Sequence, residues 1–271
     1  MRRRSLDRAV DEITRSRSSM DPVAANREVL RLLRDRVPVP TMDADGQPTT
    51  VHVTVIDWEN PANNAYLMAS QVWFAGDLGQ KRADAVGFIN GIPLLFCEFK
   101  APTQPVRDAL DGNIRDYRTT ISQVFAPTGF ALISNGHETR LGAVEAPWEH
   151  WLAWKRLDEE DAPTNSLEVA IRGACEPTRF LDIVENFLVF QEEAQKTGEV
   201  RLIKKVARNH QVLGVNRAIQ AVRDLNGNQG RLGVFWHTQG SGKSLSMVKF
   251  AEKVHRKVPG NWTFVIITDP W

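Results

Sequence analysis

Two carboxylates and an amine occupy positions that neighbouring strands could bring together. The stretch FCEFK ends an apolar run with Glu98 and Lys100 two positions apart, and alternate residues of a strand point to the same face. Asp84 lies on the preceding strand-like run, which joins this one at Asn90-Gly91, so Asp84 can face Glu98 with Lys100 alongside. Because paired carboxylates repel each other unless a divalent cation neutralises them, the trio predicts a Mg²⁺ site.

The chemistry of such a site is metal-assisted hydrolysis of a phosphodiester. A bound metal lowers the pKa of a water molecule and stabilises a pentacovalent phosphate, and Lys100 would orient that water or help to deprotonate it. A Glu-x-Lys triplet also occurs in many strands by chance. The alternative is an exposed salt bridge at a strand end, worth under about 1 kcal/mol. The residues by themselves leave both interpretations open.

A second group of residues, HTQGSGKS, could bind phosphate. Glycines allow the backbone to curl so that successive N–H groups point at anionic oxygens, and a helix N-terminus adds partial positive charge. Lys243 would reach the outer phosphates and the Ser244 hydroxyl would ligate Mg²⁺. The usual pattern has a glycine where this chain has His237, and the alternative is an ordinary glycine turn. Strands expected on both sides favour a nucleotide site. Its loop residues are Thr238, Gln239, Gly240, Ser241, Gly242, Lys243 and Ser244.

The first half of the chain predicts an α/β unit around the paired carboxylates. The predicted elements are a helix over 26–40, a strand over 50–58 after a turn at 44–48, two strands within 81–100, a helix over 106–121 and a strand over 128–136. Asn26 is the expected cap of the first helix, whose apolar face is Val29, Leu30, Leu33 and Val37. The second helix has its apolar face at Val106, Leu110, Ile114, Tyr117 and Ile121. A hairpin, a helix and a further strand make a mixed sheet.

The character of the sequence changes after about residue 145. The Trp-rich, then acidic stretch over 148–166 looks like a domain boundary, and helices are predicted after Pro177 and over 204–224. Strand, loop and helix over 231–257 and a strand over 261–269 would form a βαβ unit that opens a parallel sheet. The chain stops directly after that strand, so we expect this P-loop domain to be incomplete.

Composition excludes some classes of protein. With 34 Lys and Arg against 33 Asp and Glu, the net charge of +1 gives no global argument for nucleic-acid binding. The Arg-rich residues 1–25 are expected to form a flexible, solvated terminus rather than a DNA-binding arm. Only two cysteines, Cys97 and Cys175, argue against a disulfide framework or a zinc site. No apolar run has membrane-spanning length and no signal-peptide core is present, so a cytoplasmic protein without a membrane partner is expected.

From Asn26 to Trp271 the chain resembles the restriction (R) subunit of type I restriction–modification enzymes. These subunits carry a PD-(D/E)xK nuclease followed by a superfamily 2 DNA-translocating ATPase. The stretches that carry the resemblance are NREVLRLL, VIDWENPANNAYLMASQVWF, KRADAVGFINGIPLLFCEFKAP, LISNGHETRLGAV, WEHWLAWK, TRFLDIVENFLVF, RNHQVLGVNRAI and WHTQGSGKS. Their order along the chain is that of the family.

The resemblance implies a role for each matching residue. Asp84 and Glu98 would bind the catalytic metal and Lys100 would assist the nucleophile, with Glu28 at an acidic position that can support the metal. Where the family has Gln-x-x-x-Tyr, this chain has Asn113 and Tyr117, and asparagine is shorter by a methylene. In addition, Gln211 matches a glutamine that reads adenine in helicase-type motors; a polar or charged helix residue is the alternative for Gln211 and for Glu28.

The implied fold is an α/β PD-(D/E)xK nuclease domain with a mixed sheet, followed by the first βαβ of an incomplete RecA-like P-loop domain. The expected division is 1–25 flexible terminus, 26–160 endonuclease domain, 161–200 linker and connecting helix, and 201–271 start of the translocase. The implied cofactors are Mg²⁺ and ATP, and the implied partners are double-stranded DNA and the methylation (M) and specificity (S) subunits.

The implied function is Mg²⁺-dependent cleavage of unmethylated DNA away from the recognition site, after ATP-driven translocation by the whole complex. Two alternatives stay open. One is a helicase-linked nuclease of another defence or repair system, which binding to type I partner subunits would distinguish. The other is a non-catalytic remnant or interaction module, against which the presence of Asp84, Glu98 and Lys100 argues.

Overall fold

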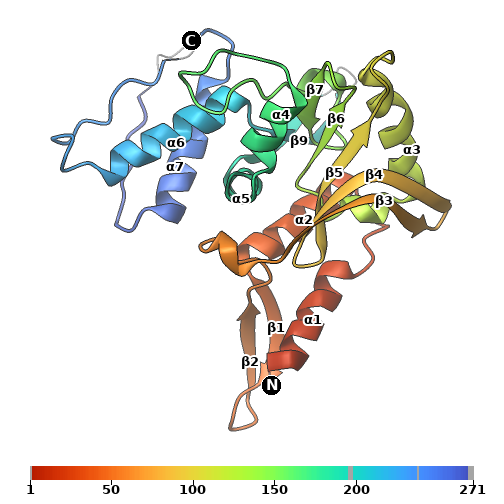
Figure 1. Cartoon of the computed structure of the whole chain (residues 1–271). Coiled ribbons are helices and arrows are strands. Elements are labelled where there is room, and N and C mark those ends of the chain that lie inside the picture. Colours follow the sequence, from red (N-terminus) through yellow and green to blue (C-terminus); the bar gives the residue numbers. More distant parts are fainter. Residues whose placement is uncertain (1, 195–197, 237, 268–271) are drawn as a thin grey trace.

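The structure is a computed structural model that describes residues 2–194, 198–236 and 238–267. Helices alternate with three groups of strands (Figure 1). The helices are α1 (Arg2–Thr14), α2 (Pro22–Asp35), α3 (Arg115–Thr120), α4 (Leu167–Ala170), α5 (Pro177–Asn186), α6 (Asn209–Arg223) and α7 (Lys243–Lys257). The strands are β1 (Val37–Met42), β2 (Pro48–Val53), β3 (Tyr66–Gly76), β4 (Gly79–Ile89), β5 (Ile92–Phe99), β6 (Phe130–Ser134), β7 (Thr139–Gly142), β8 (Leu188–Ala194) and β9 (Val200–Val206).

A five-stranded mixed sheet forms the centre of the molecule. Its order is β3-β4-β5-β6-β7, with β5 and β6 parallel and the other neighbours antiparallel. The predicted tight turn between β4 and β5 is confirmed, since Asn90 and Gly91 both have positive φ, at 50° and 82°. Strand β5 is central and mostly buried, which explains why its sequence is a nearly continuous apolar run.

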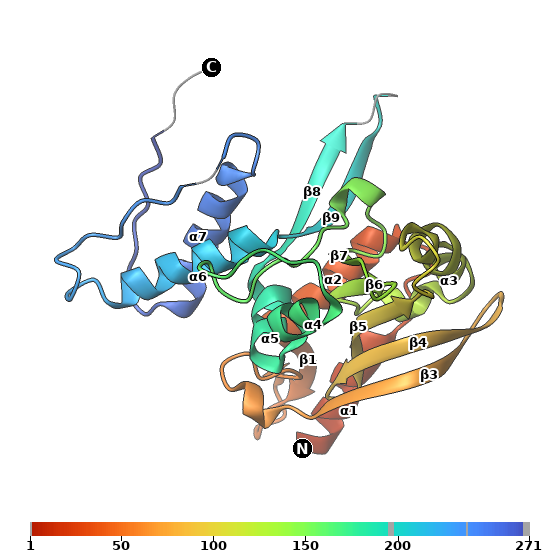
Figure 2. The same ribbon diagram turned by 45° about the horizontal axis from the view of Figure 1, so that its top comes forward.

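Two hydrophobic clusters cover the two faces of this sheet. One contains residues of α2, α5, α6 and α7, and the other contains the segment between β5 and β6 (Figures 1 and 2). In that segment a π-helical turn over Ala109–Ile114 continues into α3. The apolar face predicted for it is confirmed, because Val106, Leu110, Ile114, Tyr117 and Ile121 are all buried. This element therefore lies against the face of β5 that carries Phe96, whose ring is 5.8 Å from that of Tyr117.

The predicted flexible terminus over 1–25 is wrong for the residues that the structure describes. Helix α1 buries Ala9 and Ile13 against the larger cluster, and the guanidinium of Arg17 donates to the carbonyl oxygens of Glu12 and Ile13. Arginine-rich composition suggested a solvated segment, but the apolar residues between the arginines have helical spacing and pack on α2 and β1.

Helix α2 begins earlier and ends earlier than predicted. Asp21 caps it, accepting from the backbone N–H groups of Val23 and Ala24, and Pro22 occupies the first turn. Asn26, the predicted cap, is instead buried inside the helix. The predicted helical face ends at Leu33, because Val37 belongs to β1.

Strand β2 replaces the first half of the strand predicted over 50–58. It pairs antiparallel with β1 in a two-stranded sheet outside the central one, and the predicted turn at 44–48 connects them. Asp43 stabilises this turn by accepting from the backbone N–H groups of Asp45 and Gln47. The hairpin lies beside α1 (Figure 1).

The predicted boundary after about residue 145 is not a break in the hydrophobic core. Trp151 is fully buried in the cluster below α3, and Trp154 is buried in the other cluster. The predicted helix after Pro177 is confirmed as α5, but it ends at Asn186 and continues into the β8–β9 hairpin. The region expected to be a linker, 161–200, thus contributes buried residues to the same cluster as α2.

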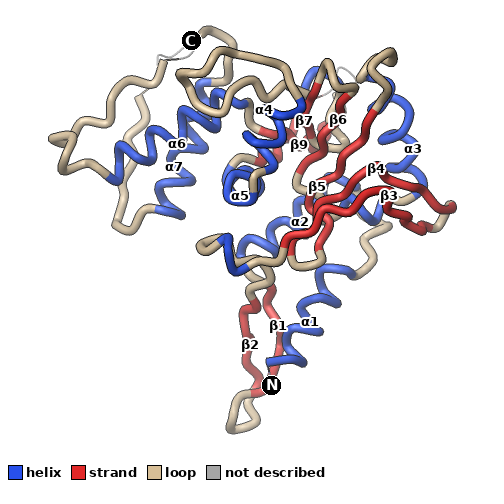
Figure 3. Tube along the Cα trace, in the orientation of Figure 1, coloured by secondary structure: helices blue, strands red, loops and turns tan. Residues whose placement is uncertain are grey.

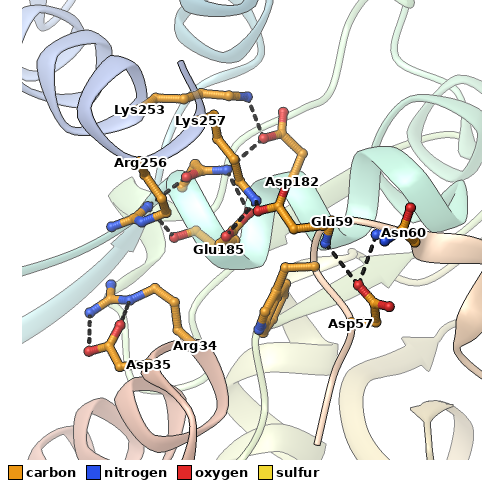
Figure 4. A network of polar contacts seen from close by, with 12 residues as sticks. Arg34, Asp35, Asp57, Glu59, Asn60, Asp182, Glu185, Lys253, Arg256 and Lys257 are labelled. Atoms are coloured by element: carbon orange, nitrogen blue, oxygen red, sulfur yellow. Dashed lines mark hydrogen bonds and ion pairs between the residues drawn. The ribbon is translucent and has the colours of Figure 1, made fainter. Parts of the chain in front are cut away.

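Helix α7 is fixed to this core by a network of ion pairs at its C-terminal half (Figure 4). Lys253 contacts the carboxylate of Asp182 on α5, while Lys257 lies 2.8 Å from Glu185 and 2.7 Å from Glu59. Glu59 belongs to the loop before β3, so α7 reaches both α5 and the segment that leads into the central sheet. Lys253, Lys257, Asp182 and Glu185 are buried or largely buried and are paired, as burial of charge requires, whereas Glu59 is exposed.

The predicted βαβ unit is wrong in its strands. Helix α7 is present, but residues 231–236 and 261–267 form no strand among the residues that the structure describes (Figure 3). Val234 and Ile267 are 93% and 89% exposed. A parallel strand gains its hydrogen bonds only from neighbouring strands, and within the described residues these two segments have no strand beside them. The same described residues contain no helix of the length and apolar character that crossing a membrane requires.

The buried amide of Asn26 gives a test of the packing between α2 and the sheet. Its Nδ2 lies 3.0, 2.8 and 2.9 Å from the carbonyl oxygens of Phe125, Ala126 and Thr128. We predict that Asn26→Ala lowers the free energy of unfolding by about 1–3 kcal/mol, because buried acceptors lose their donor. Asn26→Asp should cost more, because it adds a negative charge that faces the carbonyl oxygens.

Urea denaturation of both variants measures this effect. The matched control is Arg27→Ala, since Arg27 is the exposed neighbour on the same helix and its truncation should change the free energy of unfolding by less than about 0.5 kcal/mol. Equal stability of Asn26→Ala and Arg27→Ala would contradict a role for the buried amide.

Candidate active site

Asp84 lies beside Glu98, as predicted, but the register that places it there includes a bulge between Gly87 and Phe88 that was not predicted. The β4–β5 ladder pairs Ala85 with Cys97, so the next position places Asp84 opposite Glu98. Oδ2 of Asp84 accepts a hydrogen bond of 2.8 Å from the backbone N–H of Phe99. The carboxylate of Asp84 is therefore held at the end of the strand that carries Glu98.

Glu98 is the most buried member of the group, with 1% of its surface exposed. Its Oε1 accepts from the amide Nδ2 of Asn113, and its Oε2 lies 3.2 Å from the hydroxyl of Tyr117. That hydroxyl is also 2.8 Å from the carbonyl oxygen of Arg82, and a phenol has one proton for its two acceptors. Because Glu98 is buried on the central strand, few hydrogen bonds stabilise the negative charge of its carboxylate.

Lys100 is connected to Glu98 through Asn113. The ammonium of Lys100 donates to Oδ1 of Asn113 at 2.5 Å, whereas its distance to Oε1 of Glu98 is 3.9 Å. One amide therefore bridges the lysine and the carboxylate. The alternative of an exposed salt bridge is wrong, because both side chains are largely buried and a third residue lies between them. Asn113 reaches both partners although it is shorter than the glutamine of the family pattern.

Electrostatics at this site disfavour the ionised form of Glu98. Burial, together with the charge of Asp84, raises the pKa of Glu98 from 4.5 to about 7, against the opposing charge of Lys100. Burial also raises the pKa of Tyr117 to about 12. The site therefore holds a carboxylate that the nearby cation and hydrogen bonds do not fully stabilise.

This donor set fits a magnesium ion. Mg²⁺ is usually bound by one or two carboxylates and keeps several waters or substrate oxygens as its other ligands. Asp84 and Glu98 are two carboxylates that repel each other, and a divalent cation would remove that repulsion. Over the described residues there is no group of three or more His, Cys, Asp or Glu side chains that could hold a metal ion.

Glu28 does not join the candidate active site in this structure. Its carboxylate is 2.6 Å from Arg15 and 3.1 Å from Arg17, so it pairs with the segment between α1 and α2. The prediction that Glu28 supports the metal placed it on the correct helix. It could not take into account the two arginines, because the residues before 26 were expected to be flexible.

One residue at the site was missed from the sequence. Gln71 on β3 lies opposite Asp84, and its Nε2 is 3.4 Å from Oδ1 of that carboxylate. The stretch that contains β3 was matched to a strand block of the family only by resemblance, without a register, so nothing brought Gln71 to Asp84. The apolar residues around Gln71 and the long hairpin that follows them would have been the available signal.

The predicted phosphate loop has the backbone conformation of a glycine turn before a helix. Gly240 and Gly242 have φ of 75° and 84°, and Gly242 directly precedes α7. The positive φ favours glycine at this position, and a Cβ at Gly242 would lie 2.6 Å from Nε2 of Gln211, so that amide would have to move. Lys243 and Ser244 are exposed at the start of the helix, while His237 lies outside the described residues.

Gln211 contacts this loop directly. Its buried amide donates to the carbonyl oxygen of Gly242 at 3.1 Å and accepts from the backbone N–H of Arg208 at 2.8 Å. The amide therefore joins the start of α6 to the start of α7. Its predicted part in reading adenine stays a prediction, because the contacts of this side chain in the structure are with the protein.

A mixed sheet with Asp84 on β4, Glu98 on the central strand β5 and Lys100 directly after that strand is consistent with a nuclease-like α/β domain. The family model described as "Type I restriction enzyme R protein N terminus" matches residues 1–150 of this chain. A second model, described as "SWI2/SNF2 ATPase", matches residues 210–270. The chain belongs to the family of type I restriction enzyme R proteins, as its resemblance predicted, and the match includes the N-terminal residues thought to be flexible.

Curated relatives agree with this assignment. The chain is 32% identical over 275 residues to the type I restriction enzyme HindI endonuclease subunit of Haemophilus influenzae, covering 96% of this chain and 26% of that protein. It is 25% identical over 228 residues to the type I restriction enzyme SauMSSORF170P endonuclease subunit of Staphylococcus aureus, covering 83% and 23%. The chain thus spans about a quarter of the length of these relatives.

The raised pKa of Glu98 predicts how stability depends on pH in the presence of a chelator. Between pH 4.5 and about 7 the folded protein binds a proton that the unfolded chain has lost, so the free energy of unfolding falls as pH rises. We predict that Glu98→Gln is as stable as wild type near pH 5 and more stable near pH 8. The upper bound of the difference is roughly 3 kcal/mol, the equivalent of this shift.

Chemical denaturation at both pH values, with chelator present, measures the difference. Glu168→Gln is the matched control, because Glu168 is exposed on α4 and pairs with Arg172. A stability difference between Glu98→Gln and wild type that is the same at both pH values would contradict the raised pKa.

Proposed function

We propose that this chain forms the endonuclease part of a type I restriction enzyme R subunit and cleaves DNA with Mg²⁺. The observation that carries the proposal is the contact group of Asp84, Glu98, Lys100 and Asn113 at the end of β5. Membership of the R protein family and the names of the relatives, which are endonuclease subunits, support it.

In this proposal each residue has a stated part. Asp84 and Glu98 bind Mg²⁺, which when bound supplies positive charge that lowers the pKa of a nearby water and stabilises a phosphate under attack. Lys100 orients the attacking water. Asn113 holds Lys100 and Glu98 at a fixed separation, and Tyr117 holds Glu98 from the other side.

We further propose that the loop over 238–244 binds the phosphates of ATP and that Ser244 ligates the accompanying Mg²⁺. The positive φ of Gly240 and Gly242, the helix that follows them and the partial match to an ATPase family support this. The substrate would be unmethylated double-stranded DNA, cleaved in the cytoplasm away from the recognition site. The partners would be the methylation and specificity subunits, and ATP would drive translocation.

The nuclease proposal predicts that charge alone cannot replace Lys100. In the whole R subunit assembled with methylation and specificity subunits, Lys100→Arg should lower DNA cleavage at least about 100-fold. The guanidinium is flat and larger than an ammonium, so it cannot keep the contact of Lys100 with Asn113 while orienting a water. ATP-driven translocation should continue, because the phosphate loop belongs to a different part of the fold.

Cleavage of a plasmid and displacement of a triplex-forming strand measure the two activities separately. Lys81→Arg is the matched control, since Lys81 lies on the same hairpin and pairs with Asp116 instead. Wild-type cleavage by Lys100→Arg would mean that Lys100 is only a structural charge, and loss of both activities would indicate a folding defect.

The nucleotide proposal predicts that Lys243→Ala removes binding of ATP. In this variant the loop keeps its glycine conformation but loses the ammonium that would contact the outer phosphates. Fluorescence of a labelled ATP analogue measures binding, with Lys81→Ala as the control. Binding that is equal in Lys243→Ala and wild type would overturn the assignment of this loop.

A further inference from the structure

Gln71 has a backbone conformation that is rare inside a strand. Its φ is +54°, although it is not a glycine and lies within the eleven residues of β3. A non-glycine residue with this backbone conformation is strained. Such residues persist only where the surrounding structure imposes the conformation, and they cluster at functional sites. Here the residue across the ladder is Asp84.

The pairing of β3 with β4 is interrupted at this position. Ser70 pairs with Ala85 and Val72 pairs with Ala83, so Gln71 and Asp84 face each other without forming a ladder pair. The left-handed residue therefore stands directly opposite one of the two carboxylates of the candidate active site.

The face that β4 presents to the core also changes at this position. Val86 and Ala83 both belong to the hydrophobic cluster below α3, although their separation in a regular strand would place them on opposite faces. Ala85 packs against the other cluster. The same change occurs on β3. Ala69 pairs with Val86, and Val72, three residues after Ala69, packs in the cluster that contains Val86. The alternation thus reverses at Gln71 and Asp84.

This reversal decides where the outer half of the hairpin lies relative to α3. The carbonyl oxygen of Arg82, just beyond the reversal, accepts from the hydroxyl of Tyr117 at 2.8 Å. Asp84 stands at the reversal itself, with Oδ2 on the backbone N–H of Phe99 and Oδ1 near Nε2 of Gln71. Both oxygens of this carboxylate are therefore held by groups outside its own strand.

We propose that Gln71 is the positioning residue of Asp84 for divalent cation binding. The β4–β5 register places Asp84 opposite Glu98, the left-handed backbone of Gln71 fixes the strand conformation at Asp84, and the side-chain amide of Gln71 holds Oδ1. The contact of 3.4 Å is long for a hydrogen bond, so the backbone conformation carries the larger part of the effect. This inference rests on the proposed function, because it concerns the metal site of the proposed nuclease.

Three substitutions separate the effect of the backbone conformation of Gln71 from the effect of its side-chain amide. Gln71→Gly keeps the left-handed conformation and removes the amide, Gln71→Asn keeps both with a shorter side chain, and Gln71→Val cannot adopt this φ readily. Gln80→Val is the matched control, because Gln80 is an exposed glutamine on the partner strand of the same hairpin.

The experiment is titration of the 271-residue chain with Mn²⁺ at 20 °C, where circular dichroism shows each variant to be folded, together with its unfolding midpoint in chelator. We expect Gln71→Val to weaken Mn²⁺ binding by about tenfold or more, as loss of a supporting contact does at metal sites. Gln71→Gly should weaken binding less and unfold at or above the wild-type midpoint, because the strain is relieved. Gln71→Asn should bind more tightly than Gln71→Gly, and Gln80→Val should bind as wild type does.

Wild-type affinity in both Gln71→Val and Gln71→Gly would overturn the inference, provided that Asp84→Ala loses Mn²⁺ binding. A lower unfolding midpoint without any change in affinity would also overturn it, since Gln71 would then be only a structural residue. Failure of the wild-type chain to bind Mn²⁺, or unchanged binding in Asp84→Ala, would instead overturn the proposed metal site.

Discussion

The structure depends on one unfavourable interaction, the burial of the Glu98 carboxylate beside Asp84 on the central strand of the sheet. Water cannot solvate Glu98 there, and the neighbouring negative charge adds to the cost, which is why burial raises its pKa to about 7. The groups around it make the arrangement tolerable: Asn113 and Tyr117 contact its oxygens, and Lys100 is held nearby by Asn113. Burial that is unfavourable for folding is useful for binding a cation, because a desolvated pair of carboxylates gains most from the charge that neutralises it.

A feature of the fold or of the site could be predicted from the sequence when the interactions that produce it are between residues close together in the chain. The turn at Asn90-Gly91 is local, and it predicted the hairpin that brings β4 against β5. By itself this turn pairs Ile89 with Ile92 and would place Asp84 opposite Cys97. The bulge between Gly87 and Phe88, which was not predicted, shifts the register by one residue and places Asp84 opposite Glu98. The helical period likewise predicted the face that carries Tyr117. Positions such as Gln71 and Asn26 could not be predicted, because their roles arise from contacts with residues far along the chain, and a left-handed glutamine has no sequence signal. The strands predicted on either side of α7 failed for a related reason: apolar composition favours a strand, but only paired neighbours make one.

In the structure, segments that were predicted to be separate domains share one hydrophobic cluster. Residues of α2, α5, α6 and α7 belong to one hydrophobic cluster, and the ion pairs of Lys253 and Lys257 connect α7 to α5 and to the loop before β3. The phosphate loop is the start of this same helix α7. A displacement of α7 from α5 would therefore have to break the pairs of Lys253 and Lys257 with Asp182 and Glu185, and largely buried pairs are costly to separate because each partner would be left as an unpaired charge. Glu59 is exposed, so its pair with Lys257 contributes less. The loop and the carboxylate site lie in different parts of the fold, and the contacts of α7 with α5 and with the loop before β3 connect them (Figures 1 and 4).

The central claim, that a divalent cation replaces the proton on Glu98, is tested most directly by counting protons. Calorimetric titration of the chain with Mn²⁺ in buffers of different ionisation enthalpy gives the number of protons released for each metal ion bound. Near pH 6 the account predicts a release approaching about one proton, falling toward zero near pH 8.5 because Glu98 is then already ionised. In Glu98→Gln the release should be absent at both pH values. A release that does not change between the two pH values, or one that persists in Glu98→Gln, would contradict the account.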